Sequence, residues 1–338
     1  MLDPKVPQID RDRTQFGFSV GRHSLRMIAV IAVLTILAAS GPAASPPSAG
    51  DEPRISITPR RMLPTRKSMT RPSLRLDVKM VLIPVTVTDL WDRPIKGLAA
   101  NSFHVTEDNV EQKIASIVEE DGPVSVGFIF DASSSMKKRM APSIAAIGQF
   151  LKEAEEGDEF FLVRFSDKPT LVTGFTSDAR DILSELPSMQ AQGWTAMLDA
   201  ICLGVQQLRH AKNARRALFV LSDGGDNSSR YTESEVRNLV RESDLQLYAV
   251  GLFEKPHFLA KLAADTGGVA LWAHSLKDLP EVIDKISREM RQRYVLGYSS
   301  TNGHNDGKYR RVKIEVVPPD AETSLNVSWR RGYYAPVE

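Results

Sequence analysis

The chain has 338 residues, of which 42% are hydrophobic and 25% are charged, and its formal net charge is +1. This composition is typical of a globular protein and excludes a wholly disordered chain, a collagen-like repeat and a polytopic membrane protein. The single cysteine, Cys202, excludes an intramolecular disulfide and a multi-cysteine zinc site.

The charge is unevenly distributed along the chain. Residues 46–75 hold seven basic and two acidic side chains, a net +5, whereas residues 76–338 hold 31 basic and 37 acidic side chains, a net −6. Because the expected folded part is mildly acidic, we expect no nucleic-acid partner.

The chain begins with a segment typical of export signals. Met27–Ala39 is an uncharged apolar run that follows Arg22 and Arg26 and precedes small residues. The run is shorter than the ~20 residues of a bilayer-spanning helix. We therefore expect 1–45 to be a signal peptide, with an uncleaved signal anchor and membrane attachment as the alternative. The protein is then exported: periplasmic, secreted or associated with the cell envelope.

Residues 46–75 form a Pro-rich basic linker, with five prolines before Pro72. From there to 121 the pattern becomes strand-like. Hydrophobic residues alternate with others over 81–87, and short apolar stretches follow at 103–105 and 114–118. We expect residues 76–121 to contribute three strands of an antiparallel sheet.

Residues 122–290 have a different pattern. Apolar runs predict strands at 124–130, 160–165, 171–175, 217–222, 245–252 and 268–273. Segments with helical spacing lie between or after them, at 143–154, 178–186, 195–208, 233–241, 257–264 and 279–290. This alternation predicts an α/β fold with a doubly wound, mostly parallel sheet.

Short strands return after residue 290, at 294–298, 310–317 and 324–330. Three strands on either flank would each make a marginal sheet alone. We therefore expect 76–121 and 291–338 to form one β-sandwich, with the α/β domain of 122–290 inserted between its two parts.

Three oxygen-rich clusters lie in loops of the predicted α/β domain. Asp131-Ala-Ser133-Ser-Ser135 follows its first strand, Gly-Trp-Thr195 precedes a helix, and Ser-Asp223-Gly-Gly-Asp226 follows the 217–222 strand. Ligands of an open parallel sheet bind at the carboxyl ends of its strands. We expect all three clusters at that edge.

Two carboxylates and three hydroxyls make a hard-oxygen site of the kind that suits Mg²⁺, with Mn²⁺ as the alternative ion. The candidate metal ligands are Asp131, Ser133, Ser135, Thr195 and Asp223. Two carboxylates only just neutralise a dication, so the ion could still accept an anionic oxygen from a partner.

The three clusters, in this order, resemble the metal-ion-dependent adhesion site of von Willebrand factor A domains. The resemblance covers about 122–290. The flanking segments 81–114, 291–317 and 329–336 resemble an exported acidobacterial family related to these domains. The resemblance implies that Ser133 and Ser135 bind the metal directly and that Thr195, Asp131 and Asp223 bind it directly or through water. Ser222 departs from the more common threonine.

Simpler interpretations exist for several of these residues. The 131–135 segment could be a helix N-cap, and Thr195 could cap its own helix. Asp226 fits a turn or cap better than a metal site. Cys202 lies on an apolar helix face and is predicted to be a core residue. Trp194 could either contact a partner or pack within its loop.

We expect a non-enzymatic, exported binding or adhesion protein that uses the metal to bind an acidic group of a protein or polymer. One alternative is a structural subunit of an envelope assembly with a vestigial metal site. The other is a metal-dependent phosphoesterase, but that chemistry needs a second acid where Ser133 stands. Lys137 and Lys138 are expected to face solvent rather than clamp a phosphate.

Overall fold

The computed structural model describes residues 80–318 and 324–337, all within a compact unit that spans Ser73–Glu338. The predicted leader, 1–45, and linker, 46–75, lie outside the described residues. Among the described residues, no helix is long and apolar enough to cross a bilayer. The predicted domain boundaries stay predictions.

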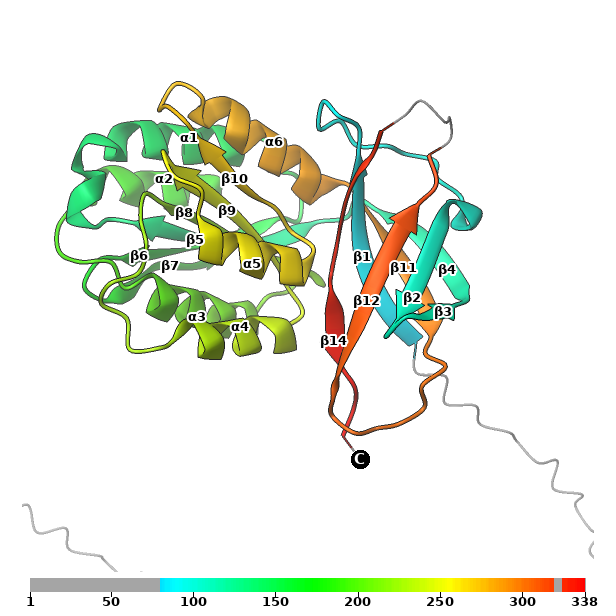
Figure 1. Cartoon of the computed structure of the whole chain (residues 1–338). Coiled ribbons are helices and arrows are strands. Elements are labelled where there is room, and N and C mark those ends of the chain that lie inside the picture. Colours follow the sequence, from blue (N-terminus) through cyan, green and yellow to red (C-terminus); the bar gives the residue numbers. More distant parts are fainter. Residues whose placement is uncertain (1–79, 319–323, 338) are drawn as a thin grey trace, which may run out of the picture. The chain divides into compact units, whose positions relative to one another are not determined.

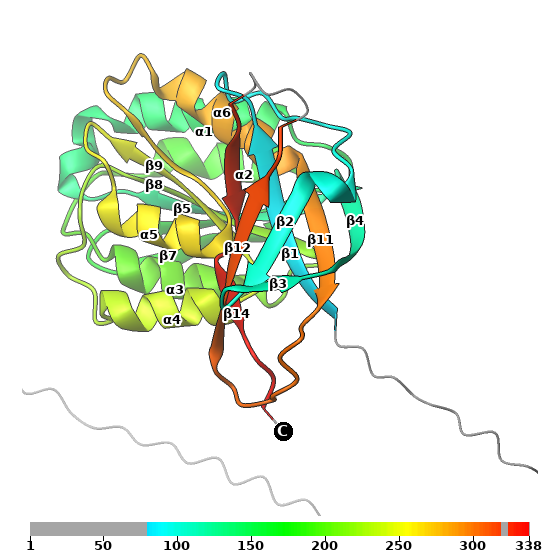
Figure 2. The same cartoon turned by 45° about the vertical axis from the view of Figure 1, so that its right-hand side comes forward.

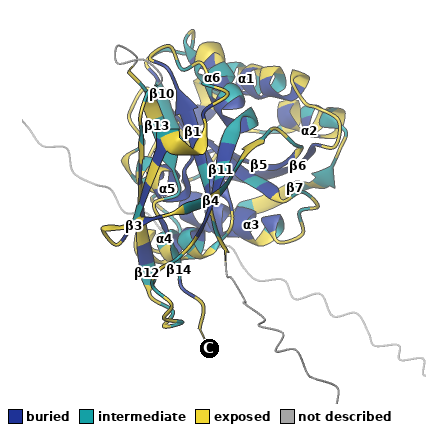
Figure 3. Cartoon of the chain, turned by 90° about the vertical axis from the view of Figure 1, so that its right-hand side faces the viewer, coloured by how far each residue is buried: buried dark blue, intermediate teal, exposed yellow. Residues whose placement is uncertain are grey.

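A six-stranded sheet forms the centre of the α/β part, with strand order β10-β9-β8-β5-β6-β7 (Figure 1). Its strands are β5 (Val124–Asp131), β6 (Glu159–Phe165), β7 (Pro169–Thr176), β8 (Arg215–Ser222), β9 (Gln246–Leu252) and β10 (Ala270–Ala273). The strands pair in parallel except β7, which is antiparallel to β6. All eight residues of β5 are buried, which explains why its sequence is a continuous apolar run (Figure 3).

Six α-helices cover the two faces of this sheet: α1 (Met140–Lys152), α2 (Ala179–Glu185), α3 (Met197–Leu208), α4 (Glu233–Glu242), α5 (His257–Thr266) and α6 (Leu279–Arg291). Helices α1, α2 and α6 share one hydrophobic cluster with the sheet, and α3, α4 and α5 share a second cluster on its other face (Figure 1). The expected doubly wound α/β fold is confirmed. Short 3-10 helices lie at Ala100–Ser102, Ser134–Lys138 and Leu186–Ser188.

The flanking segments form two four-stranded sheets, in the orders β13-β1-β11-β4 and β14-β12-β2-β3 (Figure 2). The strands are β1 (Met80–Thr88), β2 (Phe103–Glu107), β3 (Val110–Gln112), β4 (Ile114–Glu120), β11 (Arg293–Ser299), β12 (Tyr309–Val316), β13 (Asn326–Trp329) and β14 (Gly332–Tyr334). Ile83 and Leu296 from one sheet share a buried cluster with Val105 and Ile314 from the other. The expected β-sandwich built from both flanks is therefore present.

The three predicted N-terminal strands pair antiparallel as expected, but they are divided between the two sheets. Strands β1 and β4 do not pair with each other: both pair with β11, a C-terminal strand that lies between them. Strand β2 pairs with β12 and with the short β3, in the other sheet. Strands β3 and β14 were not predicted, because three residues are too few to show an alternating pattern.

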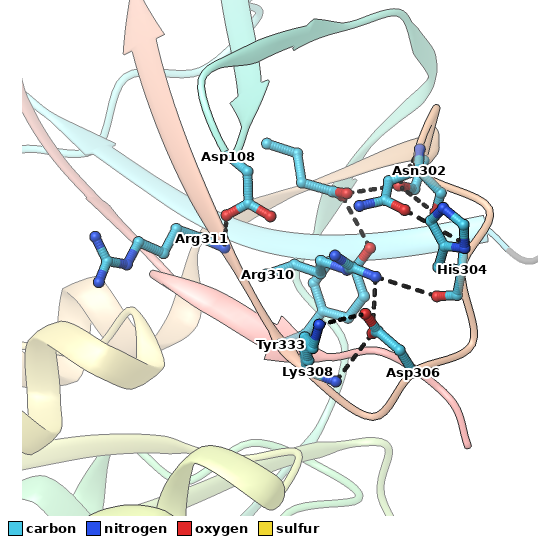
Figure 4. A network of polar contacts seen from close by, with 10 residues as sticks. Asp108, Asn302, His304, Asp306, Lys308, Arg310, Arg311 and Tyr333 are labelled. Carbon is cyan, nitrogen blue, oxygen red and sulfur yellow. Dashed lines mark hydrogen bonds and ion pairs between the residues drawn. The ribbon is translucent and has the colours of Figure 1, made fainter.

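A buried carboxylate joins the two sheets of the sandwich. Glu107 is 2% exposed and accepts hydrogen bonds from the hydroxyls of Tyr298 at 2.8 Å, Tyr333 at 2.8 Å and Ser300 at 2.5 Å. Nearby, Arg310 donates to Asp306 at 2.8 Å, which fixes the loop before β12 (Figure 4). Three donors offset the cost of burying the Glu107 charge.

Glu107→Gln is expected to lower the free energy of unfolding by about 1–2 kcal/mol, because three hydrogen bonds to a charged acceptor become neutral ones and the hydroxyl that faces the new amide must turn to accept. Urea denaturation measures this change. The control is Glu111→Gln on β3, whose side chain is 77% exposed and which should change stability by less than about 0.5 kcal/mol. Equal stabilities of the two variants would contradict this role for Glu107.

Helix α6 contains a carboxyl group that is destabilising when ionised. Glu289 is 7% exposed, and burial, aided by the charge of Asp92, raises its pKa from 4.5 to about 7. Since the folded pKa lies above the unfolded value, the folded protein holds the proton more tightly. The stability that the protonated Glu289 contributes is fully present below pH 4.5 and is lost as the pH rises through 7.

Glu289→Gln is expected to remove this pH dependence and to raise stability at pH 8 by about 3 kcal/mol, the value of such a pKa shift. At pH 4 the variant and the parent should be nearly equal. Denaturation curves between pH 4 and pH 8 measure the difference. Glu281→Gln, with a side chain that is 73% exposed on the same helix, is the control. A parent that grows more stable from pH 5 to pH 8 relative to Glu289→Gln would refute the assignment.

Candidate functional site

The three oxygen-rich clusters meet at the carboxyl edge of the six-stranded sheet. Asp131 ends β5 and Asp223 follows β8, and these two strands are parallel neighbours. The loop before α3 joins them through backbone hydrogen bonds: the N–H of Ser134 donates to the carbonyl of Gly193 at 3.1 Å, and that of Gln192 to the carbonyl of Ala132 at 2.9 Å.

Asp131 is a fully buried carboxylate at the base of the site. One oxygen accepts the backbone N–H of Ser133 at 2.8 Å, and the other accepts the hydroxyl of Ser222 at 2.6 Å. Burial raises the pKa of Asp131, although these hydrogen bonds and the charge of Arg139 act in the opposite direction. Among the described residues, Asp131 forms no ion pair. A buried carboxylate of this kind is stabilised by a bound cation.

The hydroxyl groups form a chain that ends on the second carboxylate. The Ser133 and Ser135 hydroxyl oxygens are 2.9 Å apart, and the Ser135 hydroxyl donates to Asp223 Oδ1 at 2.8 Å. Ser133 stands at the start of the 3-10 helix at Ser134–Lys138, but its side chain forms no cap hydrogen bond there. Its hydroxyl therefore contacts the hydroxyl of Ser135, another candidate ligand, rather than capping a helix.

Thr195 lies at the same edge but is not joined to the other four candidate ligands by a side-chain hydrogen bond. It is 6% exposed, and its backbone N–H donates to the side-chain oxygen of Asn227 at 2.8 Å. It does not cap α3 either: the N–H groups of Leu198 and Asp199 donate to Asp226 at 3.1 Å and to Ser229 at 3.0 Å. Asp226 is thus a capping residue, the simpler of the two roles considered for it.

Two residues at this edge were missed or underrated from sequence. In the sequence Ser222 differs from the family only as a replacement for threonine, yet in the structure its hydroxyl donates to Asp131. Arg139 was not noted at all, and its guanidinium pairs with Asp223 and lies over the Phe253 ring, 4.6 Å from the centroid. A lone arginine in the turn before a helix carries no sequence signal of this contact.

The residues fit a small oxygen-preferring dication. Four of the five candidate ligands are linked within one cluster, and they supply two carboxylates and two hydroxyls. In the part of the chain that the structure describes, no group of three or more His, Cys, Asp or Glu side chains could hold a metal. Any metal site at this edge therefore depends on the serine hydroxyls, as Mg²⁺ or Mn²⁺ coordination allows.

Other residues singled out in the sequence have simpler roles. Cys202 is buried in α3, and burial raises the pKa of its thiol to about 11, so it is an unreactive core residue as predicted. Trp194 has 67% of its surface exposed, while its backbone N–H donates to Asp167 at 2.7 Å. Its ring therefore projects into solvent beside Thr195 instead of packing in the loop.

Comparison with known proteins gives a family for this part of the chain. Residues 126–225, which include all five candidate ligands, match the family model of the von Willebrand factor type A domain. The inter-alpha-trypsin inhibitor heavy chain H4 of Bos taurus is 28% identical over 197 residues, 53% of this chain and 21% of that protein. An uncharacterized protein of Borreliella burgdorferi is 24% identical over 160 residues, 46% of each chain. The chain thus spans less than half the length of either curated relative.

Two solved structures are also similar. A von Willebrand factor type A protein from Catenulispora acidiphila aligns with a TM-score of 0.46 and 14% identity, over 75% of this chain and 73% of that one. The proximal thread matrix protein 1 of the mussel byssus, solved with zinc in its metal-ion-dependent adhesion site (MIDAS), aligns with a TM-score of 0.46 and 18% identity. The alignment covers 53% of this chain and 49% of that one. The family match assigns residues 126–225 to the von Willebrand factor type A domain family.

Proposed function

We propose that this chain is a non-enzymatic binding or adhesion protein that holds a divalent metal ion and binds an acidic group of a protein or polymer through it. The ion is Mg²⁺ or Mn²⁺, and its ligands are Asp131, Ser133, Ser135, Thr195 and Asp223. The observation that carries the proposal is the hydroxyl chain that runs from Ser133 through Ser135 to Asp223, next to a buried Asp131 that accepts the Ser133 N–H and forms no ion pair within the described residues.

The charge balance of the site favours an acidic partner. Two carboxylates neutralise a dication, and hydroxyl ligands add no charge, so the ion retains affinity for a further anionic oxygen. Ser135 is exposed, so the site opens to solvent. Beside Asp223, a cavity of about 270 Å³ lined by Gly225, Lys255 and His257, among others, has room for a partner side chain.

Surface features near the site support a macromolecular partner. Trp194, next to Thr195, is 67% exposed, and Phe253, in the loop after β9, is 42% exposed. Exposed aromatic side chains are enriched where proteins bind one another. The leader 1–45, which places the protein outside the cytoplasm or on the envelope, is part of this proposal.

The test is calorimetric titration of Mg²⁺ and Mn²⁺ into the full chain. We expect one saturating site, lost in Ser133→Ala and in Asp223→Ala. Ser134→Ala is the matched control, since Ser134 is an exposed serine between two ligands and should bind metal like the parent. Absence of metal binding in a folded parent, with and without a carboxylate-bearing peptide, would refute the proposal.

The structural-subunit alternative is favoured by one observation, the ion pair of Arg139 with Asp223, which already supplies a cation to one candidate ligand. It predicts that partner binding continues in EDTA. The phosphoesterase alternative gains no support. Ser133 occupies the place of its second acid, and Lys137 and Lys138 are both exposed to solvent.

A further inference from the structure

Both oxygens of the Asp223 carboxylate contact groups of the chain itself. Oδ1 accepts a hydrogen bond from the Ser135 hydroxyl at 2.8 Å, and Oδ2 accepts a hydrogen bond from Nη1 of Arg139. The Asp223 side chain is 1% exposed, whereas that of Arg139 is 29% exposed. The carboxylate is thus shielded from water while the guanidinium retains a path to solvent.

The backbone of Arg139 is fixed by two hydrogen bonds, and its guanidinium contacts Asp223 and Phe253. Its N–H donates to the carbonyl of Met136 at 2.7 Å, and its carbonyl accepts the N–H of Ser143 at 3.0 Å. While it pairs with Asp223, the guanidinium also lies over the Phe253 ring, 4.6 Å from the ring centroid. Phe253 has φ 70°, and its N–H donates to the carbonyl of Ala273 at 2.8 Å, which sets the ring next to the site. Separating the guanidinium from Asp223 does not require breaking the backbone hydrogen bonds of Arg139.

We propose that Arg139 is a built-in competitor of the metal ion for Asp223. This inference rests on the proposed function and concerns the regulation of the same site. A guanidinium and a dication within a few ångströms of one carboxylate repel each other, so the metal binds more weakly while Arg139 holds the Oδ2 atom of Asp223. Arg139 thereby neutralises a shielded carboxylate and lowers the affinity for metal. The contact of the guanidinium with the Phe253 ring, present in the paired state, does not depend on Asp223.

The experiment compares the parent full chain with Arg139→Met, which keeps the apolar stem and removes the charge. Lys138→Met is the matched control, because it removes one exposed positive charge from the adjacent residue. Calorimetric titration of Mn²⁺ should give a dissociation constant at least about ten-fold lower for Arg139→Met than for the parent, the equivalent of one lost charged hydrogen bond. Lys138→Met should stay within about two-fold of the parent, since exposed charges are screened.

A second measurement tests the ion pair without metal. In EDTA, Arg139→Met should melt at a lower temperature than the parent, because it leaves the shielded Asp223 charge uncompensated. In an Asp223→Asn background the same substitution should have little effect. This double-mutant comparison detects the pair even if the parent binds metal too weakly to measure.

The outcomes separate this inference from the proposed function. Tighter Mn²⁺ binding by Arg139→Met than by a parent that also binds Mn²⁺, together with the coupling to Asp223 in EDTA, supports the inference. Equal or weaker binding by a folded Arg139→Met overturns the inference and leaves the proposed metal site intact. If neither protein binds Mn²⁺, both the inference and the proposed function fail, even if the coupling is present.

Discussion

Asp131→Asn is expected to abolish metal binding and at the same time to raise the melting temperature measured in EDTA. The Asn side-chain oxygen can accept the Ser133 N–H as Asp131 does. The Asn amide can donate to the Ser222 hydroxyl, so this second hydrogen bond is kept with its direction reversed. The substitution removes a fully buried charge that forms no ion pair within the described residues, which relieves its desolvation cost. The same loss of charge should weaken Mn²⁺ binding by at least about a hundred-fold.

Calorimetry in the presence of metal and thermal denaturation in EDTA measure the two effects. Asp121→Asn, an exposed aspartate just before β5, is the control and should change neither. A variant that loses stability in EDTA would show that the Asp131 charge serves the fold rather than a ligand. Metal affinity equal to the parent would remove Asp131 from the proposed ligands.

Gly268→Ala is expected to destabilise the α/β part by about 3 kcal/mol. Gly268 lies between α5 and β10, and a Cβ added there would stand 2.1 Å from the carbonyl oxygen of Leu247 and 2.8 Å from its carbonyl carbon. These atoms are the main chain of β9, a strand whose residues are all buried. They cannot turn away as the end of a side chain could, so the two segments must separate.

Urea denaturation gives the size of the effect. The matched control is Gly174→Ala in β7, where an added Cβ meets nothing within 4 Å, and its stability should stay within about 0.5 kcal/mol of the parent or rise. If Gly268→Ala proves as stable as Gly174→Ala, the close approach of the two segments is wrong. The predicted strand at 268–273 starts only at Ala270, in keeping with a main-chain contact at Gly268.

Most of the α/β fold could be predicted from the sequence because its elements bury whole faces. The apolar run at 124–130 is β5, and the helical spacing at 279–290 is α6, within one residue at each end. The place of the candidate site was predictable too, since parallel strands bring Asp131 and Asp223 to the same edge of the sheet.

Pairing within the sandwich could not be predicted in the same way. An alternating pattern reports which face of a strand is buried but not which strand lies beside it. Ile83 of β1 stands opposite Leu296 of β11, and no local signal links positions so far apart in the chain. The alternation shared by all these strands is compatible with many pairings, and only closure of the two sheets over one core selects this one.

The sequence by itself determined the α/β fold, the sandwich built from both flanks, and the gathering of the candidate oxygen ligands at one edge of the sheet. These follow from periodicity and from the rule that parallel strands end together. Only the tertiary structure decided that Ser222 holds Asp131, that Asp226 caps α3, and that Arg139 pairs with Asp223. The physical reason is that a side-chain contact depends on a rotamer and on the packing of distant loops, whereas a buried face needs only the right spacing of apolar residues.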